Sequence, residues 1–308
     1  FTWNTYRSYV LASTFAFSGL PISVTAGNAF SPVVTVKDAY SNTITNFTGI
    51  VSFSSSDAQA TNPPSYTYLA SDNGIKTFTN QAILRTTGGQ TLSASGLGTV
   101  ATSSIINVGS LIPSSISISN LPSTSAAGSS TPFTLVARDV YGNTATSYVG
   151  SVSFSSTDPQ AILPGSYQYT VGDGGSKNFS VIFNNLGSRT LTVNQPSYTA
   201  SGTTFPALSA EAMTTVIHGA VAKYVFALPN SPQLISNRWT ANINAFDARD
   251  NAATTAGNSV TVTGNLAIDF YTASDYATKT TSYVLTNGAV KIYAIARQVG
   301  ALTITASD

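Results

Sequence analysis

The strongest constraint on the fold is that the chain repeats itself. The segment Asp38-Ala-Tyr-Ser-Asn-Thr43 recurs as Asp139-Val-Tyr-Gly-Asn-Thr144, a shift of 101 residues from Asp38 to Asp139. Among the other residues that the same shift maps onto identical ones are Gly49 (Gly150), Phe53 (Phe154), Asp57 (Asp158), Tyr66 and Tyr68 (Tyr167 and Tyr169), Asp72 (Asp173) and Lys76 (Lys177). A period near 100 residues is too long for a solenoid repeat and matches the size of a β-sandwich domain.

A third and more diverged copy follows the first two. Its matches to the first copy are Asp247-Ala-Arg-Asp-Asn251 for Asp38–Asn42, Thr272-Ala-Ser-Asp275 for Ser54-Ser-Ser-Asp57, and Gly288 for Gly74. We therefore predict an N-terminal extension at 1–12 and three domains at 13–109, 110–218 and 219–308.

Apolar residues alternate with small polar ones inside each copy. Val34 and Val36, and Leu92 and Ala94, show the period of two that is typical of half-buried strands. Clusters of Gly, Asn, Asp and Pro separate these stretches at intervals of about 8 to 12 residues. The pattern predicts an all-β protein of three tandem Ig-like antiparallel β-sandwich domains, each with about seven strands.

The composition excludes several classes of function. Charged residues make up 8% of the 308 residues, and the net charge is +1, so the chain lacks the basic surface of a nucleic-acid-binding protein. With one His (His218), one Glu (Glu211) and no Cys, we predict no catalytic residues, no cofactor and no enzyme activity. No apolar run reaches the ~20 residues of a spanning helix, so no membrane insertion is expected.

The Asp-x-x-x-Asn segments have two interpretations. Asp and Asn side chains bond their own backbone in tight turns, which makes a turn between strands the favoured interpretation. The alternative is calcium, for which Asp247, Asp250 and Asn251 are the candidate ligands. Calcium takes six to eight oxygens, and the first two copies keep a single carboxylate each, so no metal site is predicted overall.

Two further motifs bear on possible surface sites. The tyrosine pairs Tyr66/Tyr68 and Tyr167/Tyr169 are interpreted as core residues, with a stacking platform for sugar rings as the alternative. The sequons at Asn46 and Asn178 are the candidate positions for glycosylation.

The string of motifs in copies one and two resembles a known family. Ala26-Gly27, the Asp38 turn, Phe47-Thr-Gly-Ile-Val-Ser-Phe53 and Tyr66-Thr-Tyr68 are similar to the tandem Ig-like repeats of prokaryotic extracellular proteins, the filamin-like and invasin-like modules of adhesins, stalks and surface layers. The resemblance implies an extracellular, cell-surface location and supplies no catalytic residues.

The two ends of the chain suggest how copies assemble. Copy three stops after Ala301-Leu-Thr-Ile-Thr305 without a closing strand, whereas Phe1–Ala12 is a surplus segment with the composition of a strand. Donation of this segment to the next subunit predicts a head-to-tail homopolymer. The predicted interface residues are Trp3, Tyr6, Tyr9, Val10, Leu11, Leu302 and Ile304.

The alternative is that the sequence is a fragment of a longer array. In that case the protein is an Ig-like repeat adhesin or a carbohydrate-binding surface stalk, whose partner is a glycan or a host surface.

Overall fold

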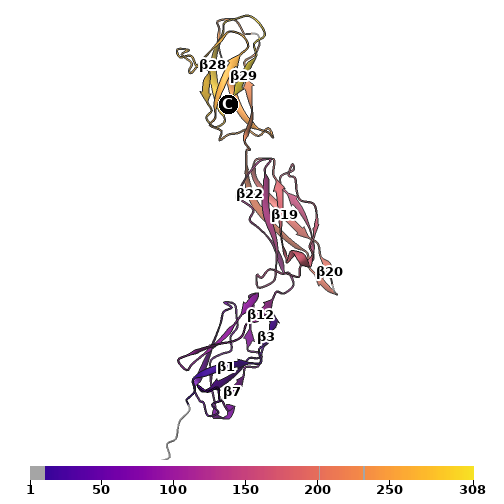
Figure 1. The fold of residues 1–308 in the computed structure, drawn as a ribbon. Helices are drawn as coiled ribbons and strands as arrows, with labels where there is room; N and C mark the ends of the chain where they lie inside the picture. Colours follow the sequence, from indigo (N-terminus) through magenta and orange to yellow (C-terminus); the bar gives the residue numbers. More distant parts are fainter. Residues whose placement is uncertain (1–10, 201, 232) are drawn as a thin grey trace, which may run out of the picture.

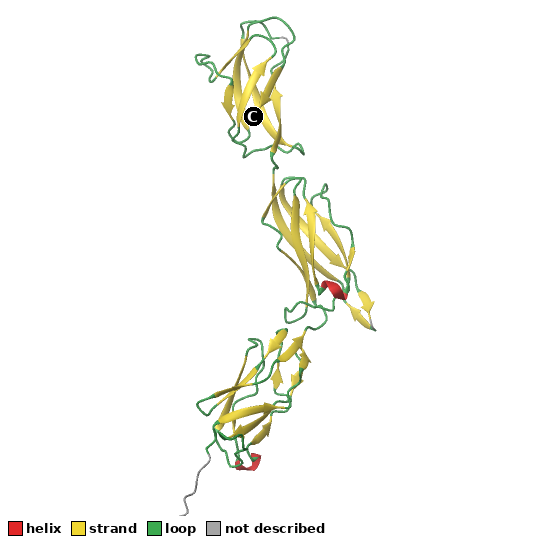
Figure 2. Cartoon of the chain, in the orientation of Figure 1, coloured by secondary structure: helices red, strands yellow, loops and turns green. Residues whose placement is uncertain are grey.

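The computed structural model describes residues 11–200, 202–231 and 233–308. Its regular structure consists of strands and of two single 3-10 turns, η1 (Ala70–Asp72) and η2 (Val171–Asp173) (Figure 2). The chain is therefore all-β, as predicted. Within the described ranges, no helix has the length and apolar character needed to cross a bilayer.

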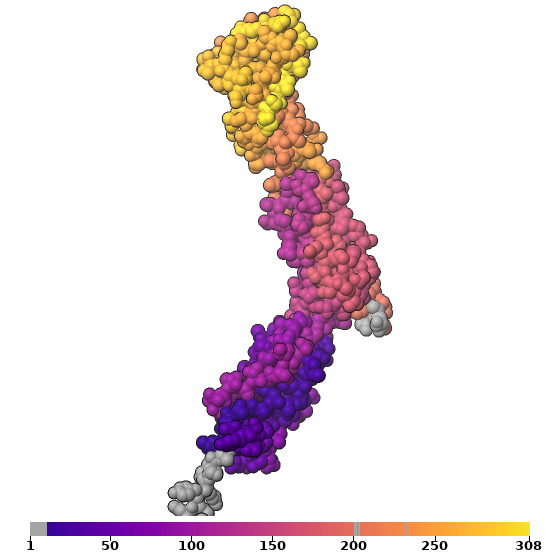
Figure 3. All heavy atoms as spheres, viewed as in Figure 1, coloured from indigo at the N-terminus to yellow at the C-terminus, as the bar shows by residue number. Residues whose placement is uncertain are grey.

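The strands fall into three groups that follow one another along the chain (Figure 1). We refer to the groups as copy one (13–109), copy two (110–218) and copy three (219–308). The copies lie end to end and give an elongated molecule, with a bend between copies one and two (Figure 3).

Copy one consists of short strands in four small sheets. They are β1 (Thr14–Ser18), β2 (Ser23–Thr25), β3 (Ala29–Phe30), β4 (Val33–Lys37), β5 (Ile50–Ser55), β6 (Tyr66–Thr67), β7 (Ile75–Thr77), β8 (Ala82–Ile83), β9 (Gly88–Gln90), β10 (Leu92–Ser95), β11 (Val100–Thr102) and β12 (Ile106–Gly109). Their orders are β1-β4-β7, β11-β10-β5-β6, β2-β12-β9 and β3-β8. The β2–β12 pair is parallel, a detail that the antiparallel prediction did not include.

Copy two has the same arrangement in longer strands. They are β13 (Ser115–Ser119), β14 (Thr124–Ala126), β15 (Ser130–Arg138), β16 (Ser151–Ser156), β17 (Tyr167–Gln168), β18 (Ser176–Ile182), β19 (Gly187–Gln195), β20 (Tyr198–Ala200), β21 (Thr203–Phe205) and β22 (Leu208–Ile217). The orders are β13-β15-β18 and β14-β22-β19-β16-β17, with β20-β21 as a projecting hairpin. Here β14 runs parallel to β22.

Copy three has fewer strands. They are β23 (Val221–Ala227), β24 (Arg238–Asp247), β25 (Ser259–Gly264), β26 (Ile268–Tyr271), β27 (Ser282–Val284), β28 (Ala289–Ala296) and β29 (Ile304–Ser307). The orders are β23-β24-β28-β26 and β27-β25-β29. Among the strands of the described residues, copy three thus has no counterpart of β14 or of β22.

The predicted alternation places the core of each copy. Val34 and Val36 on β4 and Leu191 and Val193 on β19 are fully buried, while the residues between them are less buried. Phe133 on β15 stacks on Phe179, and Ile243 and Ile292 are fully buried in copy three. Each copy therefore builds its own core from inward-facing residues at a period of two.

One glycine turn is the same in all three copies. Gly74, Gly175 and Gly288 have left-handed backbone angles, with φ of 72°, 74° and 77°. A Cβ at these positions would overlap the carbonyl oxygens of Ile44, Ala145 and Ala253, respectively. The turn therefore needs glycine for two reasons, its φ and the close approach of another backbone.

Candidate functional site

The open edge of copy three is the candidate site. Strand register identifies β29 as the counterpart of β10 and β19, because Leu92 lies opposite Ser55, Leu191 opposite Ser156 and Ile304 opposite Gly264. In copies one and two this strand is paired on both sides, to β5 and β11 and to β16 and β22. In copy three β29 pairs with β25, and no strand of the described residues lies on its other side.

Burial changes where the neighbouring strand is missing. Leu92 and Leu191 are both 0% exposed, whereas Ile304 at the same position is half-buried. In copies one and two the closing strand adds Ile106 and Val216 to the core. Copy three therefore presents core residues at an edge, where a further strand would bury them.

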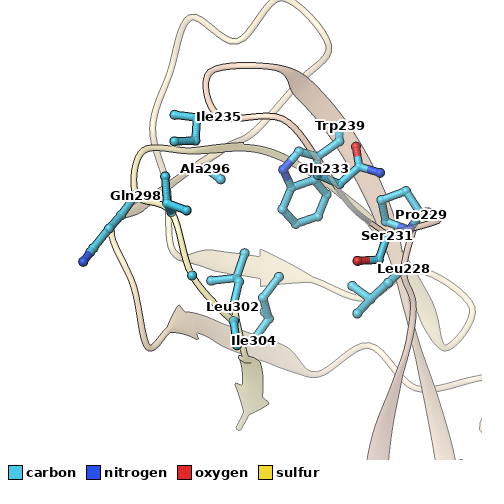
Figure 4. A pocket seen from close by; sticks show the side chains of 13 residues that line it. Leu228, Pro229, Ser231, Gln233, Ile235, Trp239, Ala296, Gln298, Leu302 and Ile304 are labelled. Atoms are coloured by element: carbon cyan, nitrogen blue, oxygen red, sulfur yellow. The ribbon is translucent and has the colours of Figure 1, made fainter.

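A cavity of about 520 Å³ adjoins this edge. It lies between the segment that follows β23 and the loop that joins β28 to β29 (Figure 4). The large apolar side chains that line it are those of Leu228, Ile235, Trp239, Val299, Leu302 and Ile304. The Trp239 side chain is buried, and its indole Nε1–H finds no hydrogen-bond acceptor among the described residues. An incoming backbone carbonyl would supply the missing acceptor.

Some of the predicted interface residues lie within the described residues and others lie outside them. Trp3, Tyr6, Tyr9 and Val10 lie outside the described residues, and Leu11 is exposed. Leu302 and Ile304, as noted, line the cavity. Trp239, Leu228 and Ile235 were not predicted from the sequence, because they are distant in sequence from the cavity residues at 296–304. The one available signal was that Trp239 is one of only two tryptophans in the chain.

The Asp-x-x-x-Asn segments form tight turns. The Asp38 carboxylate accepts hydrogen bonds from the backbone N–H of Tyr40 and of Asn42, both at 2.8 Å, and from Asn42 Nδ2 at 3.0 Å. Asp139 accepts the equivalent bonds from Tyr141 N–H, Asn143 N–H and Asn143 Nδ2, each at 2.9 Å. The Asn side chain thus closes the turn onto the Asp carboxylate.

The calcium candidates of copy three take part in the same kind of turn. Asp247 is 1% exposed and accepts from Gly219 N–H (2.9 Å), Arg249 N–H (2.8 Å), Asn251 N–H (2.9 Å) and Asn251 Nδ2 (3.0 Å). Asp250 instead points outward and contacts Lys223. The donor set is that of a turn, since the Asp247 oxygens already face four N–H groups. No cluster of three or more His, Cys, Asp or Glu side chains suited to a metal occurs in the described ranges.

A second buried carboxylate anchors a loop in copies one and two. Asp57 accepts from Arg85 N–H (2.5 Å), Thr86 N–H (2.9 Å) and Thr86 Oγ1 (2.6 Å). Asp158 accepts from the N–H groups of Asn184 and Asn185 at 2.6 and 3.1 Å. Their sequence match in copy three, Asp275, behaves differently.

Asp275 is exposed and accepts from Ala277 N–H at 3.0 Å. The corresponding loop of copy three is held by other groups. Arg297 Nε donates to Asp269 at 2.8 Å, and Thr303 N–H donates to Asn265 Oδ1 at 2.7 Å. The match of Thr272–Asp275 to Ser54–Asp57 is therefore wrong, because the counterpart of β5 is β25, whereas Thr272–Asp275 follows β26 in the other sheet.

Acid is expected to remove the contribution of these buried carboxylates. Burial by itself raises the pKa of Asp57, Asp158 and Asp247, but the hydrogen bonds that each accepts outweigh burial and hold the pKa below the ordinary 3.8. A carboxyl group with a lowered folded-state pKa stabilises the fold fully above its unfolded pKa, and this stabilisation is lost as the pH falls through the folded pKa. We expect the free energy of unfolding to change little between about pH 7 and 5 and to drop below about pH 4.

Urea unfolding measured by circular dichroism at several pH values tests this expectation. Samples returned to neutral pH serve as the control for irreversible damage. A steep loss of stability between about pH 7 and 5 would contradict it, because these carboxylates remain ionised throughout that interval.

The tyrosine pairs are core residues, as interpreted from the sequence. Tyr68 and Tyr169 are buried, and their hydroxyls donate to the carbonyls of Val34 (2.9 Å) and Leu135 (3.2 Å). The Tyr66 hydroxyl donates to Asp72 (2.9 Å), and Lys76 Nζ donates to it and lies 4.3 Å from the ring centroid. Tyr167 makes the same contacts with Asp173 and Lys177. These rings offer no platform for a sugar.

The remaining candidates lie on the surface or between copies. Asn46 and Asn178 are both exposed, whereas the Phe residue that follows each of them packs against a core. His218 lies between copies two and three, where its ring contacts Thr255. Glu211 is exposed and accepts from Thr192 Oγ1 at 3.2 Å.

Comparison with known proteins finds similarity to solved structures of surface proteins. No protein-family model and no curated protein sequence matches the chain. An Escherichia coli adhesin, FdeC, is 18% identical with a TM-score of 0.46, and the match covers 96% of this chain and 94% of that chain. Invasin, a bacterial integrin-binding protein, is 16% identical with a TM-score of 0.39, covering 96% and 57% of the two chains.

A surface-layer protein is also similar. Domains 4–9 of SbsC are 16% identical with a TM-score of 0.26, and the match covers 96% of this chain and 45% of that chain. The fold class of the present chain rests on the strand pairings described above.

Proposed function

We propose that the chain is a non-enzymatic structural protein of the cell surface that polymerises head to tail by strand addition. The open outer edge of β29, beside an apolar cavity, is the observation that carries the proposal. An added strand would pair with β29, bury Ile304 and Leu302, and occupy the place that β22 has in copy two. The proposed occupant is Phe1–Ala12 of a second copy.

The connections between copies support this occupant. The closing strand of copy one ends at Gly109, and β13 begins at Ser115. The closing strand of copy two ends at Ile217, and β23 begins at Val221. β1 begins at Thr14. If the first ten residues formed a strand in a second copy, the connection from that strand to β1 would be about as long as the two connections between copies. The donated segment would therefore lead directly into the first strand of copy one, as β22 leads into the first strand of copy three.

The composition and shape suit such a polymer. A chain with 8% charged residues and a net charge of +1 has little self-repulsion to oppose association. The copies lie end to end, so that a head-to-tail contact extends the molecule into a filament. A location outside the cell is in keeping with the sequence resemblance and with the descriptions of FdeC, invasin and SbsC.

Removing the donor or blocking the acceptor tests the proposal. Deletion of residues 1–12 is expected to abolish fibres in electron micrographs and leave monomers in light scattering. Ile304→Asp places a charge on the half-buried face of β29 and is expected to do the same. Thr305→Asp is the matched control, because Thr305 is exposed on the opposite face of the same strand, and its fibres should persist.

The deletion keeps the test independent of folding defects in copy three. Far-ultraviolet circular dichroism reports whether Ile304→Asp remains folded. Fibres of unchanged length from the deletion variant would overturn strand addition by this segment. Monomers from every form, including the unaltered chain, together with saturable binding to a glycan array would favour the alternative of an adhesin or carbohydrate-binding stalk.

A further inference from the structure

The two joints between copies use the same side chain. At the joint of copies one and two, Asn143 Nδ2 donates to the Arg85 carbonyl oxygen at 2.7 Å, and Thr87 N–H donates to Asn143 Oδ1 at 3.0 Å. At the joint of copies two and three, Asn251 Nδ2 donates to the Asn184 carbonyl oxygen at 3.0 Å. In both cases the Asn closes its own turn and also binds the backbone of the loop that precedes the last strands of the previous copy.

The connecting segment is held in the same way at both joints. Leu111 N–H donates to Asp139 Oδ2 at 3.0 Å, and Gly219 N–H donates to Asp247 Oδ2 at 2.9 Å. The donor precedes the turn Asp by 28 residues in each case. The side chain two residues after the turn Asp packs on a glycine of the previous copy. Tyr141 packs on Gly27, and Arg249 packs on Gly128.

Copy one carries the same turn at its outer end. Lys37, which precedes the turn, pairs with Thr14 at the start of β1, so the turn lies at the end of copy one away from copy two. Tyr40, at the position of Tyr141 and Arg249, is 84% exposed. Counting back 28 residues from Asp38 leads to Val10. The turn at Asp38–Asn42 therefore has the same Asp and Asn as the turns at the two joints. Within the described residues, no other copy packs against it.

Copy three presents the complementary loop at its own outer end. Residues 297–303 join β28 to β29, as the loop at 84–87 joins β8 to β9 and the loop at 183–186 joins β18 to β19. Ile295 at the end of β28 pairs with Arg238 at the start of β24, and β24 ends at Asp247 in the joint with copy two. The loop is thus at the far end of copy three, next to the cavity. Val299 within it is 78% exposed.

We propose that the Asp38–Asn42 turn of one chain docks on the 297–303 loop of a second copy and repeats the internal joints between subunits. This inference rests on the proposed strand addition, because an added strand would bring copy one to the loop by the same short connection as at the internal joints. The Asn42 amide then donates to a backbone carbonyl of the loop, and the Tyr40 ring covers the surface beside it.

Cross-linking tests this contact, since the chain contains no cysteine. A Tyr40→Cys, Val299→Cys double variant treated with a short bismaleimide is expected to convert most of the polymerised chains into a ladder of covalent multimers on a denaturing gel. Both positions are highly exposed, so neither substitution threatens folding. A Gln59→Cys, Tyr141→Cys variant is the positive control, because Gln59 Nε2 contacts the Tyr141 carbonyl within one chain at 3.4 Å.

An Asn178→Cys, Val299→Cys variant is the negative control, because Asn178 is exposed on β18 of copy two, away from both joints. Fibres in the micrographs without a ladder would overturn the joint and leave strand addition standing. The absence of fibres from the double variant and from the unaltered chain would overturn both. A ladder from the Asn178 variant equal to that from the Tyr40 variant would show random collision and would also overturn the joint.

Discussion

Gly175→Ala is expected to destabilise copy two by about 3 kcal/mol or more. The residue has φ of 74°, where an L side chain costs roughly 1–2 kcal/mol. The added methyl group would also overlap the carbonyl oxygen of Ala145, a backbone atom that cannot turn away as a side chain can. Relief requires the turn before β18 to separate from the turn that contains Ala145.

The neighbouring glycine provides a matched control. Gly174 has φ of 59°, and a Cβ there would meet no atom within 4 Å. Gly174→Ala therefore carries the cost of the left-handed backbone without the overlap, roughly 1–2 kcal/mol. Hydrogen exchange of copy-two peptides in increasing urea, followed by mass spectrometry, compares the two variants. Equal losses of protection would contradict the role assigned to the Ala145 carbonyl.

Asp247→Ala is expected to destabilise copy three by about 3–5 kcal/mol. The substitution leaves the N–H groups of Gly219, Arg249 and Asn251 and the Asn251 amide without the acceptor that they now share. These groups are at the joint with copy two, so the loss also loosens the connection between the copies. Unfolding in urea, followed by the fluorescence of Trp239 on the same strand, measures the change.

Asp250→Ala is the control for the loss of a carboxylate from the same turn. Its side chain is 75% exposed and forms a surface ion pair with Lys223, so the expected change is below about 1 kcal/mol. Both variants are made with Trp3→Phe, so that Trp239 is the only fluorescent tryptophan. A loss as large for Asp250→Ala as for Asp247→Ala would mean that net charge, rather than the hydrogen bonds of the turn, determines stability here.

Much of the architecture could be predicted from the sequence because it depends on local and repeated patterns. The shift of 101 residues exposed the repeat, and the period of two in stretches such as Val34–Val36 placed the core. The interpretation of the tyrosine pairs as core residues is confirmed for Tyr68 and Tyr169, which are buried. The pair recurs in copies one and two, as expected for residues of a core that both copies share, whereas a single binding surface would not need two pairs.

The joints and the cavity could not be predicted, because they depend on contacts between distant residues. The sequence identified Asp139–Asn143 as a turn, but nothing local indicates that Asn143 also binds the Arg85 carbonyl, 58 residues earlier. Trp239 lines the cavity with residues from two loops, whose paths are decided by packing. The match of Asp275 to Asp57 is wrong, because strand register makes Gly264 the counterpart of Ser55, whereas Asp275 follows β26 in the other sheet.

The Asn side chains at the joints bind backbone carbonyl groups, and this affects how such chains evolve. Asn143 binds the carbonyl oxygen of an arginine, and Asn251 binds that of an asparagine. Because every residue has a carbonyl group, a substitution at that position of the loop keeps the acceptor of this hydrogen bond. A gene duplication that adds one more copy therefore brings a working joint with it, and arrays of this kind can change length in a single genetic event.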